Sequence, residues 1–292
     1  MRRFIQAIRG FWSASHKVQI GIVILAFFIL VALFHPLINS AIGHGSDPLA
    51  VSASEAWELP NAQHLLGTDR YGRDILAMTV TATVASLEVG TIAGLLSTII
   101  GVVVAFVAGY KGGKLDSFLS GFTDIILVVP SFPLLITLSA YTTKVSLFFI
   151  ALMLAIFSWP FAARTIRSQV LSLRNRPYVE LAKVTKLNDF EIIFMELLPN
   201  LLPFIGVGFA SAALGSIFAL VGLEVIGLGP SGTLDLGLML NWAQSWGALT
   251  LGCWPLFVAP VVVLTLLFLA VNLINIGLEE VYNPRLRKMA GA

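Results

Sequence analysis

Long apolar runs limit this chain to a small set of folds. The first extends from Ile20 to Phe34 without a polar side chain and, with its flanks, is long enough to cross a lipid bilayer. Only 12% of the 292 residues are charged, whereas a soluble domain is typically nearer a quarter. The sequence therefore predicts an all-α membrane protein with six transmembrane helices, the other five at residues 85–109, 117–140, 145–165, 200–225 and 252–276.

Lysine and arginine are distributed unevenly among the segments that join these runs. With the N-terminus inside, the cytoplasmic segments carry 15 of the 18 basic residues, which is the bias that orients membrane helices. We therefore expect both termini in the cytoplasm. The expected parts are a cytoplasmic N-terminal segment, a first transmembrane helix, an extracytoplasmic segment, a five-helix core and a cytoplasmic tail, at 1–17, 18–38, 39–84, 85–280 and 281–292.

A secretory signal peptide is the competing interpretation of the first apolar run. The polar segment in front of the run is long, and no small-residue cleavage site follows at Asn39–Ile42. These features favour a retained membrane anchor.

The segment from Ala162 to Pro203 is a long polar interruption between apolar runs, with six basic residues. Pro177 is suited to the first position of a helix, where its missing N–H would be unpaired anyway. Asn188, with Glu191 three residues on, matches a capping box at the start of a second helix, which we expect to end before Pro199. Helical spacing puts four side chains of the first helix on one face: Tyr178, Leu181, Ala182 and Thr185.

Such a short helix with one apolar face, outside the bilayer, fits a groove on another protein. An amphipathic loop lying on the lipid surface has the same pattern. The pattern alone leaves both interpretations open.

Sequence signatures of covalent chemistry are missing from this chain. It has no G-x-x-x-x-G-K-[ST] phosphate loop, so it cannot hydrolyse ATP by that route, and it has neither H-E-x-x-H nor G-x-S-x-G. Cys253 is the only cysteine, which excludes a disulfide within the chain, and it lies in an apolar run that indicates a buried thiol. We expect no enzymatic activity, and no cofactor or metal bound to this chain.

Acidic side chains near the apolar runs are candidates for function, because an intramembrane charge is costly. Asp124 lies about two turns into the third run, whereas Glu88 and Glu224 lie near the ends of theirs. A structural hydrogen bond from Asp124 to a neighbouring helix is favoured over a proton relay. Pro130 and Pro133 are expected to break the same run, either as part of a pathway or as a static bend.

Small residues recur along two of the runs at spacings that allow helices to approach closely. They indicate helix contacts, within this chain or with a partner. In the second run they are Gly90, Gly94, Gly101 and Gly109, and in the fifth Gly206, Gly208, Ala212 and Gly215.

Four sequence pieces, in this order, resemble a known family. They are HLLGTDRYGRDIL at His64–Leu76, AGYKGGKLD at Ala108–Asp116 followed by PSFP, an E-x-A…L-P-N pattern (Glu180, Ala182, Leu198, Pro199, Asn200), and GLGP at Gly227–Pro230 with a tail ending NPRLR at Asn283–Arg287. Over about residues 15–288 the chain resembles the inner-membrane permeases of ABC importers, in the dipeptide, oligopeptide and nickel group. Within that group it resembles the shorter of the two permease partners.

The resemblance implies that this chain supplies half of a transmembrane pathway in the plasma membrane of a prokaryote. The implied partners are a homologous second permease, two ABC ATPase subunits that hold ATP and magnesium, and an extracytoplasmic solute-binding protein; no nucleic acid is implied. The cargo would be short peptides or oligosaccharides. A coupling loop at about 165–199 would contact the ATPases through Pro177, Tyr178, Glu180, Leu181, Ala182, Thr185, Lys186 and Asn188.

This chain departs from the family pattern at several positions, one of them near the end of the last apolar run, where it has Asn275, Ile276 and Gly277. Leu181 stands where the group favours alanine, and Glu224 where it has serine. Lys186 stands where it favours glycine, so we expect a bend with ordinary dihedral angles or added helix length there.

Two other function classes compete with the importer subunit. One is a carrier driven by an ion gradient through Asp124, and the other is a membrane scaffold that transports nothing. The cytoplasmic E-x-A…L-P-N pattern distinguishes the importer subunit from the carrier, because a carrier has no need of this pattern.

Overall fold

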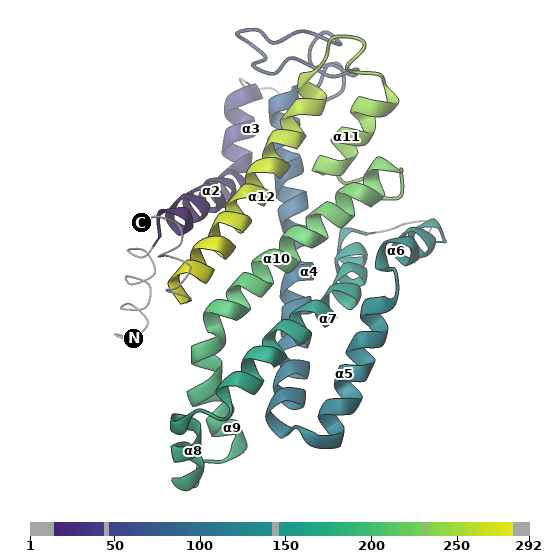
Figure 1. Cartoon of the computed structure of the whole chain (residues 1–292). Coiled ribbons are helices and arrows are strands. Elements are labelled where there is room, and N and C mark those ends of the chain that lie inside the picture. The colour runs from purple at the N-terminus through teal and green to yellow at the C-terminus, as the bar shows by residue number, and fades with distance from the viewer. Residues whose placement is uncertain (1–14, 44–46, 142–145, 231, 283–292) are drawn as a thin grey trace. The chain divides into compact units, whose positions relative to one another are not determined.

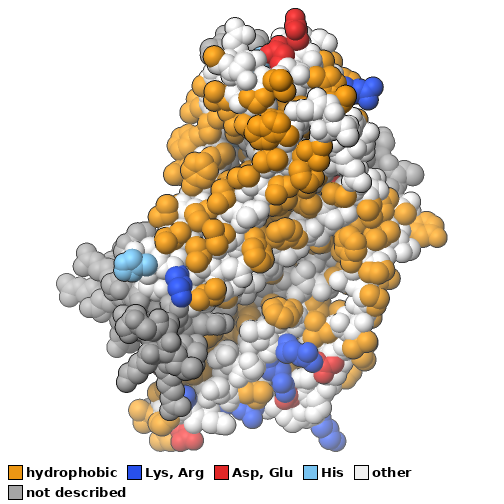
Figure 2. Space-filling model, turned by 45° about the horizontal axis from the view of Figure 1, so that its top comes forward, with side chains coloured by type: hydrophobic (Ala, Val, Ile, Leu, Met, Phe, Trp, Pro, Cys, Tyr) orange, Lys and Arg blue, Asp and Glu red, His pale blue; other side chains and the backbone are white. Residues whose placement is uncertain are grey.

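Helices dominate the computed structural model, which describes residues 15–43, 47–141, 146–230 and 232–282. Over these ranges no β-strand is present, and the one isolated bridge joins Thr68 to Asp74. Five helices are long and apolar enough to cross a membrane, or six if one bent pair counts as a single span. Hydrophobic side chains cover much of the described part of the face shown in Figure 2, as expected where lipid is the solvent. The all-α, multi-span prediction is confirmed, whereas most of the expected cytoplasmic tail 281–292 and most of the segment 1–17 lie outside the described residues.

The longest connection between successive helices is the segment between α3 and α4 (Figure 1). Their bounds are α2 His16–Leu33, α3 His35–Gly43, α4 Ile75–Lys111, α5 Gly113–Val128, α6 Ser131–Ala140, α7 Leu147–Leu173, α8 Pro177–Val184, α9 Asp189–Glu191, the π-helical η1 Ile192–Leu197, α10 Leu198–Val225, α11 Leu236–Ser245 and α12 Pro255–Tyr282.

Several bounds differ from the expected ones because polar residues continue helices. The second span begins at Ile75 rather than at residue 85, since threonine and serine side chains are accommodated in its first turns; the Thr79 hydroxyl, for example, donates to the carbonyl oxygen of Ile75 at 2.7 Å. The helix expected over 18–38 ends at Leu33, and α3 extends the chain beyond it. Helix α11 was not expected.

The chain divides into two compact units. One comprises residues 1–87, 224–227 and 232–292, and the other comprises residues 88–223 and 228–231. The division falls inside α4 and near the end of α10.

In the first unit, α2 lies against α12 through small residues. A β-carbon at Gly21 would lie 2.6 Å from the carbonyl oxygen of Ala270, and one at Gly277 would overlap the Val18 side chain. Glycine is therefore required at both crossings for this close approach. Helix α11 also packs on α12 in this unit.

Residues 47–74 of the first unit form an irregular segment that leads into α4. Gly67 and Gly72 have φ angles of +76° and +71°, in the left-handed region that favours glycine. A β-carbon at either position would collide with a backbone carbonyl oxygen, that of Glu58 or Ser54 respectively. The glycine spacing of the LGTDRYGRD motif is thus required by two tight backbone crossings.

In the second unit, glycines of α4 let α7 and α10 approach. A β-carbon at Gly94 would lie 2.9 Å from Ala213, and one at Gly101 would lie 2.8 Å from the Ala162 β-carbon. The expected helix contacts of the second apolar run are confirmed, since Gly90 and Gly109 also meet side chains closely. Along α10, by contrast, nothing in the described part of the chain lies within 4 Å of the β-carbon positions of Gly206, Gly208 and Gly215.

The third apolar run is broken at one of its two prolines. Helices α5 and α6 meet at an angle of 68°, and Pro130 lies at the break as the residue before α6, with a φ of −68°. Pro133 lies within the first turn of α6, where its missing N–H breaks no intrahelical bond. The break at Pro130 is confirmed, and the break at Pro133 is wrong.

Candidate coupling site

Helix α8 begins where the sequence predicts. Pro177 is its first residue, and Arg176 before it is extended, with φ −79° and ψ 147°. This is the backbone state that a residue in front of proline prefers. Arg174 fixes the approach to the helix, because its guanidinium donates to the carbonyl oxygen of Gly109 at the end of α4, at 2.7 Å.

The inner face of α8 is apolar and buried within the second unit. Val179 and Ala182 are fully or almost fully buried. Tyr178 packs against the same cluster, and burial raises the pKa of its phenol. The cluster consists of residues from α4, α7, α8, η1 and α10, namely Ala105, Phe106, Ile166, Val170, Val179, Ala182, Ile192, Leu197 and Leu201. Helix α8 is thereby anchored to three long helices.

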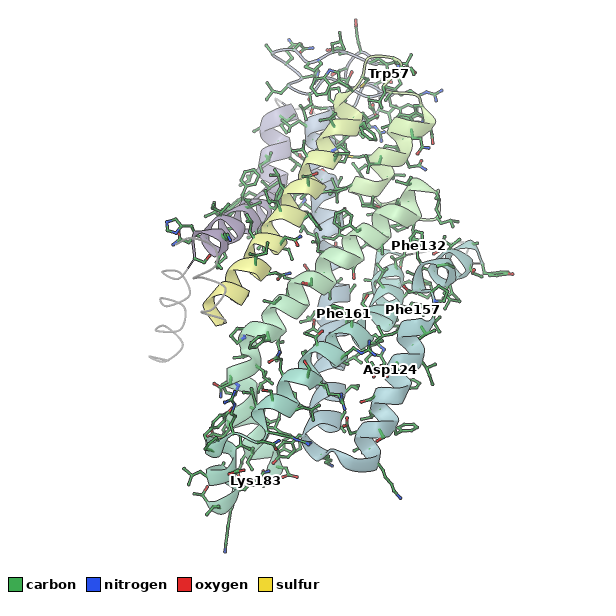
Figure 3. All side chains as sticks on the ribbon, viewed as in Figure 1. Trp57, Asp124, Phe132, Phe157, Phe161 and Lys183 are labelled. Atoms are coloured by element: carbon green, nitrogen blue, oxygen red, sulfur yellow. The ribbon has the colours of Figure 1, made fainter. Side chains whose placement is uncertain are left out.

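The outer face of α8 carries two large apolar side chains that this chain does not cover. Leu181 is 64% exposed and Val184 is 78% exposed. They lie three residues apart, so they are neighbours on one helix face. The charged side chains of Glu180 and Lys183 are exposed beside them; Lys183 is labelled in Figure 3.

The single face expected for Tyr178, Leu181, Ala182 and Thr185 is wrong. Ala182 points into the apolar cluster, whereas Leu181 and Thr185 are exposed. The reason is the position of the long helices: the buried face of α8 is centred on Val179 and Ala182, and Leu181 falls outside it. The hydroxyl of Thr185 donates to the carbonyl oxygen of Ala182 at 2.9 Å and so closes the end of the helix.

Lys186 makes the turn that follows α8. Its φ is +60°, a left-handed backbone that a non-glycine residue rarely adopts. The N–H of Leu187 donates across this turn to the carbonyl oxygen of Ala182 at 3.2 Å, the bonding of a helix end that reverses through a left-handed residue. The expected bend with ordinary dihedral angles is therefore wrong, and lysine occupies a conformation that suits glycine.

Asn188 starts the next helical stretch with the expected capping box. Its side-chain oxygen accepts from the N–H of Glu191 at 2.9 Å, and the Glu191 carboxylate accepts from the N–H of Asn188 at 2.8 Å. The expected end before Pro199 is wrong, because α9, η1 and α10 continue without a break to Val225. Pro199 is the second residue of α10, directly after the wider π turn, where a proline ring is more easily accommodated.

Asp124, the acid expected inside the third run, lies on α5 and faces α7 (Figure 3). Its carboxylate is 2.5 Å from a guanidinium nitrogen of Arg164. About one turn further along α7, the guanidinium of Arg167 donates to both oxygens of Asp116, at 2.6 and 2.7 Å. Asp124 is thus ion-paired to a base from the next helix, a partner that sequence spacing did not reveal, and both side chains of this pair are more than half exposed.

A second polar network, not anticipated from the sequence, joins the ends of the 47–74 segment in the first unit. The Ser54 hydroxyl is 2.9 Å from Nε2 of His64, and Nδ1 of His64 is 2.7 Å from the Asp74 carboxylate. The other oxygen of Asp74 accepts from the N–H of Ala77 and caps α4.

The serine, histidine and aspartate stand in the order of a catalytic triad. Their hydrogen bonds instead connect two parts of the backbone segment. The N–H of Ser54, which would be the nearest donor to an oxyanion, already donates to the carbonyl oxygen of Gly72. His64 therefore ties residue 54 to the start of α4, and the HLLGTDRYGRD motif supplies His64 and Asp74.

Apolar helices long enough to span a membrane, with a short two-faced helix between two of them, are compatible with a transport permease. Residues 97–288 match the family described as binding-protein-dependent transport system inner membrane component. The chain belongs to this family and is a multi-pass protein of the plasma membrane.

Individual relatives agree with this assignment over almost the whole chain. The chain is 30% identical over 278 residues to the oligopeptide transport system permease protein OppC of Bacillus subtilis (strain 168), which covers 95% of this chain and 88% of the relative. It is 31% identical over 286 residues to the dipeptide transport system permease protein DppC of Haemophilus influenzae, covering 96% of each. With the DppC of Alkalihalophilus pseudofirmus the identity is 32%, over 92% of this chain and 86% of the relative.

Family membership leaves the ion-driven carrier without support. Asp124, the acid that this interpretation would use, is ion-paired to Arg164.

Proposed function

We propose that this chain is a permease subunit of an ATP-driven importer and forms half of the pathway for short peptides. A homologous permease supplies the other half, and two ABC ATPase subunits bind ATP and magnesium on the side to which the lysine and arginine bias assigns α8. An extracytoplasmic binding protein delivers the cargo. The names of the relatives, oligopeptide and dipeptide transport permeases, favour peptides over oligosaccharides.

The two-faced character of α8 carries this proposal. The exposed pair Leu181 and Val184 is a surface for a groove on an ATPase subunit, because such a helix gains free energy by burying its apolar side in a partner. The buried pair Val179 and Ala182 fixes the helix to α4, α7 and α10. A displacement of α8 by the ATPase would therefore be transmitted to three spans, and conformations that differ in this contact would be shifted by ATP.

Two further contacts stiffen the connection between α8 and the spans. The Tyr110 hydroxyl at the end of α4 donates to the Asp189 carboxylate at 3.0 Å. The ammonium of Lys183 lies 5.9 Å from the centre of the Tyr110 ring, a cation–π distance. With the Arg174 bond to Gly109, the end of α4 contacts the residues on both sides of α8.

The test is to place a charge on the exposed face. Leu181→Asp or Val184→Asp should weaken ATPase binding by about 2 kcal/mol, or about 30-fold, if the pair acts as a central interface contact. We would measure co-purification of the ATPase subunits and ATP-dependent peptide uptake in cells that contain the whole system. Ser117→Asp, at an exposed polar position in the first turns of α5 and outside the coupling loop, is the matched control.

Loss of both ATPase binding and uptake in the two α8 variants, with the control unchanged, would support the proposal. Uptake at the wild-type rate with a charge at both positions would exclude α8 as the coupling contact. The cargo is tested separately: the tagged chain is purified in mild detergent from its native membrane, and the binding protein that accompanies it is assayed with peptides and with oligosaccharides. Binding of oligosaccharides alone would overturn the peptide assignment.

A further inference from the structure

Two carboxyl groups are buried where α10 ends and α11 begins, within the first unit. Glu224 is next to the last residue of α10 and is 3% exposed, and Asp235, the residue that caps α11, is 0% exposed. No step of the proposed transport cycle uses either of them. Burial of two acids together is costly unless their charge is reduced or compensated.

The donors around the pair satisfy only some of its oxygen atoms. Oδ1 of Asp235 accepts from the N–H groups of Gly237 and Leu238, at 2.7 and 3.1 Å. Oδ2 of Asp235 and Oε1 of Glu224 are buried and have no donor among the described residues. The two carboxyl side chains lie within hydrogen-bonding reach of each other. Two acceptor oxygens form a hydrogen bond only if one of them carries a proton.

No cation replaces that proton among the described residues. The hydroxyl of Ser86 on α4 accepts from the N–H of Leu236, and the Asn241 amide of α11 donates to the carbonyl oxygen of Val225. Both groups are uncharged. The guanidinium of Arg73, which lies over the Trp242 ring of α11, is bound to Asp69. The net charge of the two carboxyl groups therefore depends on whether they themselves hold a proton.

Helix ends decide which carboxyl holds the proton. Asp235 lies at the N-terminus of α11, where two backbone N–H groups and the helix dipole stabilise a negative charge. Glu224 lies at the C-terminus of α10, where the dipole disfavours one. Asp235 is thus the ionised acceptor, and Glu224 is the protonated donor.

We propose that Glu224 and Asp235 form a proton-binding site that holds one shared proton and thereby ties the end of α10 to the start of α11. Removal of that proton leaves two negative charges in contact at a buried position, and the two helix ends then separate. If the importer function proposed above is correct, uptake depends on proton occupancy at this site. The site itself is tested without any transport measurement.

The direct measurement is infrared spectroscopy of the purified assembly at neutral pH. The wild type should show the carbonyl stretch of a buried protonated carboxylic acid, which is separate from carboxylate and amide bands. Glu224→Gln should remove this band while its amide still donates to Asp235, and Asp235→Asn should remove it because its amide donates to an ionised Glu224. Glu88→Gln, at an exposed glutamate of α4, is the control and should leave the band unchanged.

A second readout is the dependence of unfolding on pH. In the unfolded chain both carboxyls are ionised at neutral pH, so the folded state holds one proton more. Its stability must then fall as the pH rises from neutral, by about tenfold in the folded-to-unfolded ratio per pH unit while the proton stays bound. Glu224→Gln should abolish this slope, and Glu88→Gln should retain it.

Absence of the acid band in the wild type, or its persistence in Glu224→Gln, would overturn the proposal. So would equal pH slopes in wild type and Glu224→Gln. Failure of the uptake assays with both of these readouts positive would instead count against the importer function alone.

Discussion

The two polar segments between long helices, residues 47–74 and 174–191, keep their shapes by different means. The first relies on buried charges: Asp69 accepts from the backbone and guanidinium of Arg73, and Asp74 accepts from His64. The second relies on helix caps and on apolar anchoring of one face of α8. Consequently the first segment cannot lose one of its buried charged groups without loss of structure, whereas the second can vary its outer side chains freely. That freedom suits a surface that meets a partner protein.

The largest effect should follow from Asp69→Ala in the first segment. This substitution leaves the Arg73 guanidinium buried without its partner and frees the N–H groups of Tyr71 and Arg73, both of which donate to Asp69. Breaking a buried pair from one side costs about 3–5 kcal/mol. The thermal unfolding temperature of the purified assembly should fall strongly.

Glu55→Gln is the control for this variant, because Glu55 lies in the same segment but is exposed. Its unfolding temperature should equal that of the wild type. If Asp69→Ala were as stable as Glu55→Gln, buried charge would not be what holds this segment, and the contrast between the two segments would disappear.

An aspartate introduced into α8 should affect stability differently on the buried and on the exposed face of the helix. Ala182→Asp introduces an unpaired carboxylate into the apolar cluster and should destabilise the chain by several kcal/mol. Leu181→Asp, one residue earlier but exposed, should change stability by less than about 0.5 kcal/mol. Thermal unfolding of the two purified variants measures this difference directly. Equal destabilisation would mean that α8 has no free face in the isolated permease.

The capping box is the next largest contribution to the second segment. Asn188→Ala removes the acceptor for the N–H of Glu191 and should cost about 1 kcal/mol. Asn188→Asp retains an acceptor at that position and should restore most of the loss. A small drop in unfolding temperature for alanine alone is the expected result, and equal drops for both substitutions would show that the cap oxygen is not the source of the effect.

In this second segment, the starts of the helices could be predicted from the sequence. Pro177 and the Asn188–Glu191 pair act on backbone groups within three residues, so their positions alone determine what they do. The same holds for the apolar runs, whose length and composition predict spans without any knowledge of packing.

Contacts between residues far apart in the chain could not be predicted from the sequence. Leu181 and Ala182 are both apolar, and only the positions of Ile166 and Val170 on α7 decide that Ala182 is the buried one. Asp124 finds its partner on α7, forty residues away in sequence. The apolar run that contains Glu224 gave no sign that the Asp235 carboxyl would meet it, because Asp235 begins α11, a helix that the sequence did not predict.

Lys186→Gly should give the smallest effect, in the opposite direction to the others. A left-handed backbone costs a non-glycine residue about 1–2 kcal/mol, and glycine recovers this while losing about 0.5–1 kcal/mol through the entropy of the unfolded chain. The net result should be a gain in stability of up to about 1 kcal/mol, measured as a raised unfolding temperature. Lys183→Gly, within α8, is the matched control and should lower it, since glycine weakens a helix interior. Because Lys186 is exposed, a loss of stability in Lys186→Gly would indicate that its side chain contributes to the turn. In that case the outer residues of the second segment would be less free to vary than the comparison with residues 47–74 implies.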